Sequence, residues 1–147
     1  MNFVMIEDGF LSLNECNTLI KKYKNKTNKE TLSQHVSYAM CDIIGEDNLN
    51  KKSIKLINKY RKMYPSLEMT AEKWGMKSYF FKHFPPGYSF SEWHSEHCLT
   101  YPNRILCCQV YLSDHNCGTE FYDPNETVMS KAGRAVIFPA FWTHTHR

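Results

Sequence analysis

Two short clusters in the C-terminal half of the sequence hold the side chains best suited to chemistry. The first reads Trp93-His94-Ser95-Glu96-His97, and the second reads Trp142-Thr143-His144-Thr145-His146. Residues i and i+2 of a β-strand project from the same face, so His94 and Glu96 can point at one metal ion. A histidine from the distant second cluster can complete a set of three ligands.

Two histidines and one carboxylate on one face of a metal ion leave its other face open. This is the ligand set of non-haem Fe(II) oxygenases, which need vacant positions for a cosubstrate and for O2. The three residue types alone are weakly specific, since a lone histidine is more often packed or solvent-facing than a ligand. The pattern indicates a metal site, with His144 and His146 both open as the distal ligand.

The elements that must position these side chains fall into two parts of a single domain. We expect an N-terminal part, residues 1–75, made of a strand and helices, and a strand-rich part, residues 76–147. Ser12, with Glu15 three residues later, forms a capping-box pattern. Apolar residues at helical spacing follow, so the sequence predicts a helix over 13–24.

The rest of the N-terminal part is less regular. A strand is predicted over 3–6, and the polar segment 25–33 is expected to be a connection. A second helix is predicted near 51–64, because Pro65 follows its end and apolar residues recur at helical spacing. The residues expected on one face of this helix are Ile54, Ile57, Tyr60 and Arg61.

The strand-rich part alternates apolar runs with turn signals. Strands are predicted over 77–84, 105–112, 119–122 and 134–138. Turns are predicted at Pro85-Pro86-Gly87, Gly118, Pro124-Asn125 and Gly133. This series predicts an α+β, mainly β fold, a sandwich or barrel in which two preceding helices cover one sheet. Substrate choice is expected to depend on the loops 98–103 and 123–130.

Length and composition exclude several classes of protein. The 147 residues suit one domain, and 42% hydrophobic with 22% charged residues excludes a disordered chain. No apolar run approaches the roughly 18 residues of a membrane span, and the acidic start lacks a signal peptide's basic region, so we expect no membrane and a cytoplasmic location. The net charge of +3 identifies no partner, and because a run of lysines is usually a solvated face, nucleic acid is only a weak option as a partner.

Five motifs in a fixed order resemble the 2-oxoglutarate- and Fe(II)-dependent oxygenase superfamily, and best match its prolyl-4-hydroxylase-like branch, common in bacteria and phages. The resemblance covers about residues 76–147, and the opening FVMIEDGFLSLNECNTLI is similar to that branch as well. The motifs are Trp93-His94-Ser95-Glu96, Arg104-Ile105-Leu106 leading into Val110-Tyr111-Leu112-Ser113-Asp114, Gly118-Thr119-Glu120-Phe121, Gly133-Arg134-Ala135-Val136-Ile137-Phe138-Pro139 and Trp142-Thr143-His144-Thr145-His146-Arg147.

The resemblance implies a double-stranded β-helix, a distorted jelly roll, in which His94, Glu96 and a C-terminal histidine hold Fe(II). It implies 2-oxoglutarate as the cosubstrate that chelates the iron, O2 as the oxidant and ascorbate as a further candidate cofactor. The reaction is then hydroxylation of an unactivated C–H bond, with peptidyl proline as the substrate at family level and a small molecule as the other class. It also implies a bacterial, viral or phage-encoded protein. The oligomeric state stays open.

The metal ligands depart from the family pattern in one respect and are ambiguous in another. The acidic ligand is Glu96, where most of the superfamily has aspartate. Halogenating relatives lack this carboxylate, so its presence favours hydroxylation. We favour His146 as the distal ligand, because the family's iron histidine usually precedes a basic or small residue such as Arg147. His144 is the alternative.

The residues expected to contact 2-oxoglutarate depart further from the family pattern. In the family, a lysine or arginine on the strand after the distal histidine pairs with the far carboxylate of 2-oxoglutarate. This sequence ends at Arg147, so we expect one or more C-terminal strands to be missing from it. The alternatives are that Arg147, or an upstream residue such as Arg104, takes that role, or that the protein binds 2-oxoglutarate poorly. Tyr79 matches a tyrosine that in relatives contacts the cosubstrate carboxylate.

Three other classes of protein compete with this interpretation. A degenerate oxygenase fold can serve as a non-catalytic binding module. A cupin-like metal protein would use His94, Glu96, His97 and His144, but its paired histidines should be two residues apart. A structural zinc module would use His94, His97, Cys107 and Cys117, at a spacing that fits no recognised pattern.

Overall fold

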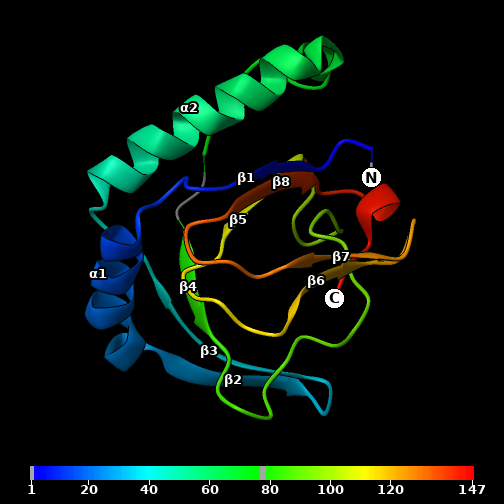
Figure 1. Ribbon diagram of the computed structural model, residues 1–147. Coiled ribbons are helices and arrows are strands. Elements are labelled where there is room, and N and C mark those ends of the chain that lie inside the picture. The colour runs from blue at the N-terminus through cyan, green and yellow to red at the C-terminus, as the bar shows by residue number, and fades with distance from the viewer. Residues whose placement is uncertain (1, 77–78) are drawn as a thin grey trace.

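The computed structural model describes residues 2–76 and 79–147, and within them the fold is mostly β, with two α-helices and short antiparallel strands (Figure 1). The helices are α1 (Leu13–Tyr23) and α2 (Asp47–Met63). The strands are β1 (Met5–Glu7), β2 (Asn28–Ser33), β3 (Val36–Asp42), β4 (Phe80–His83), β5 (Leu106–Val110), β6 (Gly118–Phe121), β7 (Glu126–Met129) and β8 (Ala135–Pro139). They form sheets of order β1-β8-β5, β2-β3-β4 and β6-β7. None of the helices in these residues has the length and apolar character to cross a lipid bilayer.

Strand β8 is central to the first sheet, and both of its faces are buried. Its side chains alternate, as strand geometry requires. Ala135 and Ile137 pack with residues of α2, whereas Val136 and Phe138 pack with Phe121 in the interior. This continuous apolar run lies close to the prediction over 134–138 and carries the core from the helix side to the interior.

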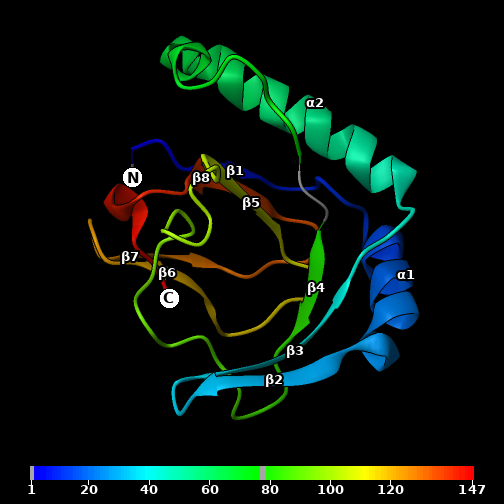
Figure 2. The same cartoon turned by 180° about the vertical axis from the view of Figure 1, so that it is seen from behind.

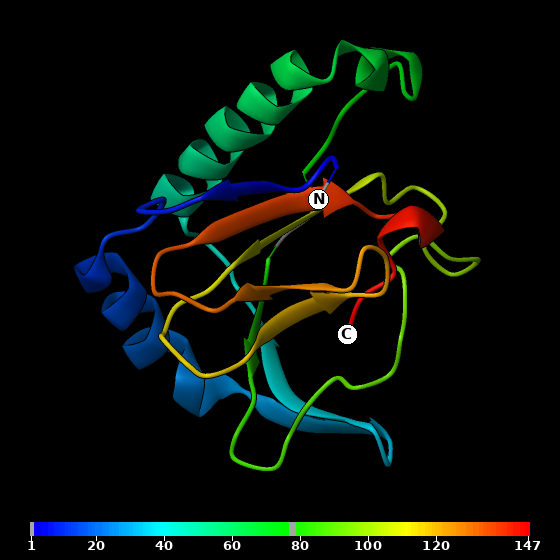
Figure 3. The ribbon, with the colours of Figure 1, turned by 45° about the vertical axis from the view of Figure 1, so that its right-hand side comes forward.

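Helix α1 confirms the predicted capping box. The Glu15 backbone N–H donates to the Ser12 hydroxyl at 3.2 Å, and the Ser12 N–H donates to the Glu15 carboxylate at 2.7 Å. Cys16 and Leu19 are buried against Phe81 of β4. Helix α2 instead lies along the β1-β8-β5 sheet, as Figure 3 shows, so the two helices pack on different sheets.

The buried face of α2 matches the predicted one only in part: Tyr60 is buried and Ile57 is partly buried against the same core. Ile54 is 49% exposed, while the buried residues are Leu49, Ser53, Leu56 and Tyr60. Ser53 occupies a core position because its hydroxyl donates to the Leu49 carbonyl at 2.7 Å. Because a hydrogen-bonded serine occupies one of the buried positions, the spacing of the apolar residues alone did not show which face of α2 is buried.

The segment expected to be a connection forms strands instead. Residues 28–33 are β2, which pairs with β3, and β3 in turn pairs with β4. After its first strand, the N-terminal part therefore contains strands as well as helices. Its strands β2 and β3 form a sheet with β4 of the C-terminal part. Seen from behind in Figure 2, this hairpin lies on the side of the molecule opposite α2. Edge strand β2 has no buried residue, and its sequence, NKETLS, is polar except for the exposed Leu32.

The expected loop 123–130 is also partly a strand. Residues 126–129 form β7, paired with β6, and Val128 is buried against Phe121. Only one of its four side chains is buried, so the run is too short and too polar to show alternation. The predicted strand over 77–84 is observed as Phe80–His83, with residues 77–78 outside the described part.

Gly133, in the turn before β8, meets the backbone of Leu11. Its φ is +79°, a β-carbon there would lie 2.0 Å from the Leu11 carbonyl oxygen, and the Leu11 N–H donates to the Gly133 carbonyl at 3.2 Å. We expect Gly133→Ala to lower the free energy of unfolding by roughly 2–3 kcal/mol, measured by denaturant titration. Gly87 has the similar φ of +82° with open space around it, so Gly87→Ala should cost only about 1 kcal/mol. Equal losses of unfolding free energy for Gly133→Ala and Gly87→Ala would show that the close contact with Leu11 adds nothing to the cost.

Candidate metal centre

Backbone pairing brings the two histidine clusters together. The His94 N–H donates to the His146 carbonyl at 3.0 Å, and the His146 N–H donates to the His94 carbonyl at 2.9 Å. On its other side, the C-terminal segment exchanges two hydrogen bonds of 2.9 Å between Arg147 and Glu120 of β6. The last residues therefore lie as a strand between the segment around His94 and the β6-β7 pair, which places His94 and His146 side by side.

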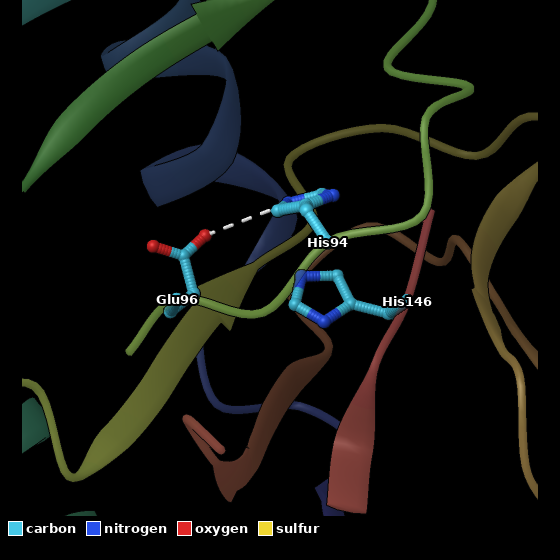
Figure 4. Close-up of side chains that lie close together, drawn as sticks. All are labelled: His94, Glu96 and His146. Carbon is cyan, nitrogen blue, oxygen red and sulfur yellow. Dashed lines mark ion pairs between the residues drawn. The ribbon is translucent and has the colours of Figure 1, made fainter. Parts of the chain in front are cut away.

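The side chains of His94, Glu96 and His146 converge, as Figure 4 shows. One potential ligand atom from each lies within 4.8 Å of the others, and this is the sole such group of three in the described residues. His94 Nε2 is 3.8 Å from Glu96 Oε1, and the two imidazole rings are 4.4 Å apart. We refer to these residues as the His-Glu-His cluster.

Hydrogen bonds fix the orientation of both imidazoles. His94 Nδ1 lies 3.0 Å from the Glu92 carbonyl oxygen, and His146 Nδ1 lies 2.9 Å from the His144 carbonyl oxygen. A carbonyl only accepts hydrogen bonds, so each Nδ1 carries a proton, and Nε2 is the nitrogen left to bind a metal. Backbone carbonyls in this position set the tautomer of metal-binding histidines in the same way.

His146 is buried among aromatic side chains. The rings of Phe138 and Phe121 lie 4.9 Å and 6.0 Å from the His146 ring. The pKa of His146 is lowered to about 4, chiefly by burial and in smaller part by the nearby His94, against the hydrogen bond to the His144 carbonyl. His146 is therefore neutral at pH 7, the form that a metal ion binds.

The carboxylate of Glu96 has two differently placed oxygens. Oε2 accepts a short hydrogen bond from Arg104, whose guanidinium lies 3.8 Å over the Tyr101 ring. Oε1 faces His94 across 3.8 Å. The longer arm of glutamate therefore reaches the cluster, with one oxygen paired to Arg104 and the other directed at His94.

Geometry places His146, and not His144, beside the other two residues. His144 Nε2 lies 2.9 Å from the Asn2 carbonyl and its Nδ1 lies 3.0 Å from the Thr143 hydroxyl, so both ring nitrogens are engaged away from Glu96. His97 also lies apart, with its Nδ1 3.1 Å from the Arg104 carbonyl. The ligand sets of the cupin-like and zinc-module alternatives are therefore not assembled.

Tyr79 and Arg147, the predicted cosubstrate contacts, also lie outside the cluster. The Tyr79 hydroxyl donates to Ser53 of α2 at 2.7 Å and lies 3.4 Å from the Cys108 thiol. Burial raises its pKa above the usual value. Arg147 Nε donates to Glu120 at 2.7 Å, and its guanidinium lies 4.3 Å over the Trp93 ring. Tyr79 thus packs between helix and sheet, and Arg147 pairs at the surface.

Two stacked aromatic side chains, Phe90 and Tyr38, lie next to the cluster and were not identified from the sequence. The Phe90 ring lies 4.0 Å from the His94 ring and is stacked on Tyr38 at 6.1 Å. Tyr38 belongs to β3, within the stretch that contains the unpredicted hairpin. Its alternation with buried Val36 was the available signal.

The donor set fits an iron ion that keeps an open face. Two ligand atoms that each lie about 2.1 Å from one ion are about 3 Å apart when adjacent. The observed 3.8 Å between His94 and Glu96 therefore needs only a small contraction. Two neutral imidazoles and one carboxylate are the ligands of non-haem Fe(II) centres. The side chains of His94 and Glu96 are 25% and 22% exposed, so the cluster is reachable from solvent.

Solved structures with the same fold are prolyl hydroxylases. A viral collagen prolyl hydroxylase from Paramecium Bursaria Chlorella virus-1, solved with 2OG, superimposes with a TM-score of 0.71 at 18% identity, covering 99% of this chain and 86% of the viral one. A Pseudomonas putida prolyl-4-hydroxylase gives 0.67 at 16% identity, covering 98% and 83%. No family model and no curated protein matches the sequence. The chain shares the fold of these prolyl hydroxylases, which confirms the likeness in fold that the sequence resemblance implied.

Proposed function

We propose that this protein is an Fe(II)- and 2-oxoglutarate-dependent oxygenase that hydroxylates an unactivated C–H bond, and that its strands form a double-stranded β-helix. The observation that carries the proposal is the His-Glu-His cluster, assembled within a prolyl-4-hydroxylase-like fold. A likeness in fold alone does not define an activity. The cluster adds a ligand set suited to iron, with an open face for a cosubstrate and O2.

In this proposal the chain's own residues hold and orient the metal. His94 Nε2, His146 Nε2 and Glu96 Oε1 are the three ligands. Arg104 holds the second oxygen of Glu96 and leaves Oε1 free to bind. Bound iron with 2-oxoglutarate supplies the oxidising chemistry, and Phe90, with the interior rings, keeps the ligand side of the site apolar.

We propose peptidyl proline as the substrate class, with a small molecule as the alternative. The neighbours in fold are named as prolyl hydroxylases, one of them of collagen. The aromatic residues beside the ligands suit a peptide, because they combine apolar area with polar edges. Trp93 is 36% exposed and stacks edge-on with the exposed Tyr122 at 5.2 Å. A cytoplasmic location stays a prediction from the sequence.

The test is an anaerobic Fe(II) titration in the presence of 2-oxoglutarate. We expect stoichiometric iron binding and the weak visible charge-transfer band of the iron chelate, followed by succinate release once O2 is admitted. Iron binding without the band or succinate would instead favour a non-catalytic binding module. Absence of iron binding would refute the proposal.

A further inference from the structure

The turn of the β2-β3 hairpin contacts the segment that precedes the His-Glu-His cluster. The Ser33 hydroxyl donates a hydrogen bond of 2.5 Å to a carboxylate oxygen of Glu92 and accepts one of 3.1 Å from the His35 N–H. The His35 carbonyl in turn accepts from both the N–H and the hydroxyl of Ser91, at 2.9 Å and 2.8 Å. These hydrogen bonds join the turn to residues 91 and 92, just before His94.

The segment that the turn holds supports the His94 imidazole in two ways. The Glu92 carbonyl lies 3.0 Å from His94 Nδ1, so this residue is bonded to the hairpin through its carboxylate and to the imidazole through its carbonyl. Phe90 lies against the imidazole, with 4.0 Å between ring centres. Phe90 is itself held by the hairpin, through a β-bridge to the buried Val36 and a stacked contact with Tyr38 at 6.1 Å. Both supports of the imidazole therefore depend on the hairpin.

The Glu92 carbonyl matters for metal binding because it sets both the orientation and the tautomer of the ring. A proton held on Nδ1 leaves Nε2 as the nitrogen that binds a metal, and the same hydrogen bond fixes the direction of the ring. Residues 91–93 belong to no helix or strand and lie between isolated bridges at Phe90 and His94. The place of the carbonyl is therefore set largely by the hydrogen bonds to the hairpin turn.

We propose that Ser33 is a positioning residue for His94: by holding Glu92, it fixes the carbonyl that orients the metal-binding imidazole. This inference rests on the proposed function. It assigns to metal binding a residue 59 positions before Glu92, in a segment that the sequence predicts to be a connection. The partners that orient a ligand are worth 10- to 100-fold in metal affinity, and a residue one step further from the metal should be worth less.

The experiment measures Fe(II) affinity by anaerobic calorimetry in the wild-type protein, in Ser33→Ala, in Glu92→Ala and in the double variant. We expect each single variant to weaken Fe(II) binding about 3- to 10-fold. The double variant should lose no more than the weaker single variant, because both substitutions remove the same hydrogen bond. Ser33→Thr, which keeps a hydroxyl, should restore wild-type affinity.

Ser37 offers a matched control in the same hairpin. Its hydroxyl donates to the Thr31 hydroxyl at 3.4 Å, within the β2-β3 pair. Ser37→Ala should therefore remove a hairpin hydroxyl and leave the Fe(II) affinity unchanged. The denaturant midpoints of Ser33→Ala and Ser37→Ala should lie close together, so that a difference in Fe(II) affinity between them does not come from stability.

A second measurement needs no metal. The nitrogen-15 spectrum of the histidine rings in the metal-free protein, recorded at alkaline pH so that the rings are neutral, reports which nitrogen carries the proton. His94 should be the Nδ1–H tautomer in the wild-type protein and in Ser37→Ala, and a mixture of both tautomers in Ser33→Ala. A loss of stability alone would not change the tautomer of the folded protein.

The outcomes separate this inference from the proposed function. If the wild-type protein binds Fe(II) and Ser33→Ala binds it equally tightly, the positioning role is refuted while the proposed function stands. Additive losses in the double variant would refute it too, because Ser33 would then act other than through Glu92. If the wild-type protein binds no Fe(II), the proposed function is refuted, and an unchanged His94 tautomer in Ser33→Ala would refute the positioning role as well.

Discussion

His146→Ala should abolish stoichiometric Fe(II) binding, whereas His144→Ala should leave it intact. The two residues are two positions apart, so they test the geometry sharply. His146 Nε2 belongs to the cluster, and its Nδ1 is fixed by a backbone carbonyl. Loss of one of three protein ligands should reduce iron affinity by more than about 100-fold, since even the supporting partners of a ligand are worth 10- to 100-fold. The measurement is anaerobic calorimetry with Fe(II) alone.

The control variant tests stability and binding separately. His144 is buried, with its Nε2 bonded to the Asn2 carbonyl, so His144→Ala should cost about 1–3 kcal/mol of unfolding free energy. Its iron affinity should nevertheless stay within a fewfold of wild type. His94→Ala and Glu96→Ala should behave like His146→Ala, and His97→Ala like His144→Ala. Loss of iron binding on His144→Ala, with full retention on His146→Ala, would show the distal ligand to be misassigned.

Sequence patterns predicted those parts of the fold that depend only on residues close together in the chain. The capping box of Ser12 and Glu15 fixed the start of α1, and the apolar run of β8 marked a buried strand. Strand alternation also placed His94 and Glu96 together, because it acts within three residues. These elements needed no knowledge of distant contacts.

Features that depend on distant partners were missed or left open. The hydroxyl of Ser53 is fully satisfied in the core through two bonds, one to the nearby Leu49 carbonyl and one from Tyr79, 26 positions away. Strand β2 is polar, and its place is set by pairing with β3. The choice between His144 and His146 depends on which of them meets His94 across the sheet, and no local pattern contains that information. Tertiary pairing therefore decided each of these points.

Phe138→Ala should cause the largest loss of stability among the substitutions considered. The ring is fully buried and packs edge-on against Phe121 at 5.0 Å and His146 at 4.9 Å. Removing a buried phenylalanine ring costs about 3–5 kcal/mol, through lost transfer free energy and the cavity that remains. Against a typical total of about 5–15 kcal/mol, this should shift the denaturant midpoint markedly. Because the cavity adjoins His146, Fe(II) affinity should also fall, by about tenfold.

Ile137 distinguishes support of the cluster from general stability. It is equally buried on the same strand, but its side chain faces α2 and packs with Leu56 and Tyr60. Ile137→Ala should therefore cost a comparable 2–5 kcal/mol while leaving the Fe(II) affinity of the folded protein unchanged. Equal iron affinities for the two variants would mean that the ring under His146 serves only the core. A weaker Fe(II) affinity for Phe138→Ala than for Ile137→Ala, at similar stability, would show that the interior face of β8 holds His146 in place. The central strand of the sheet would then contribute to stability through one face and to metal binding through the other.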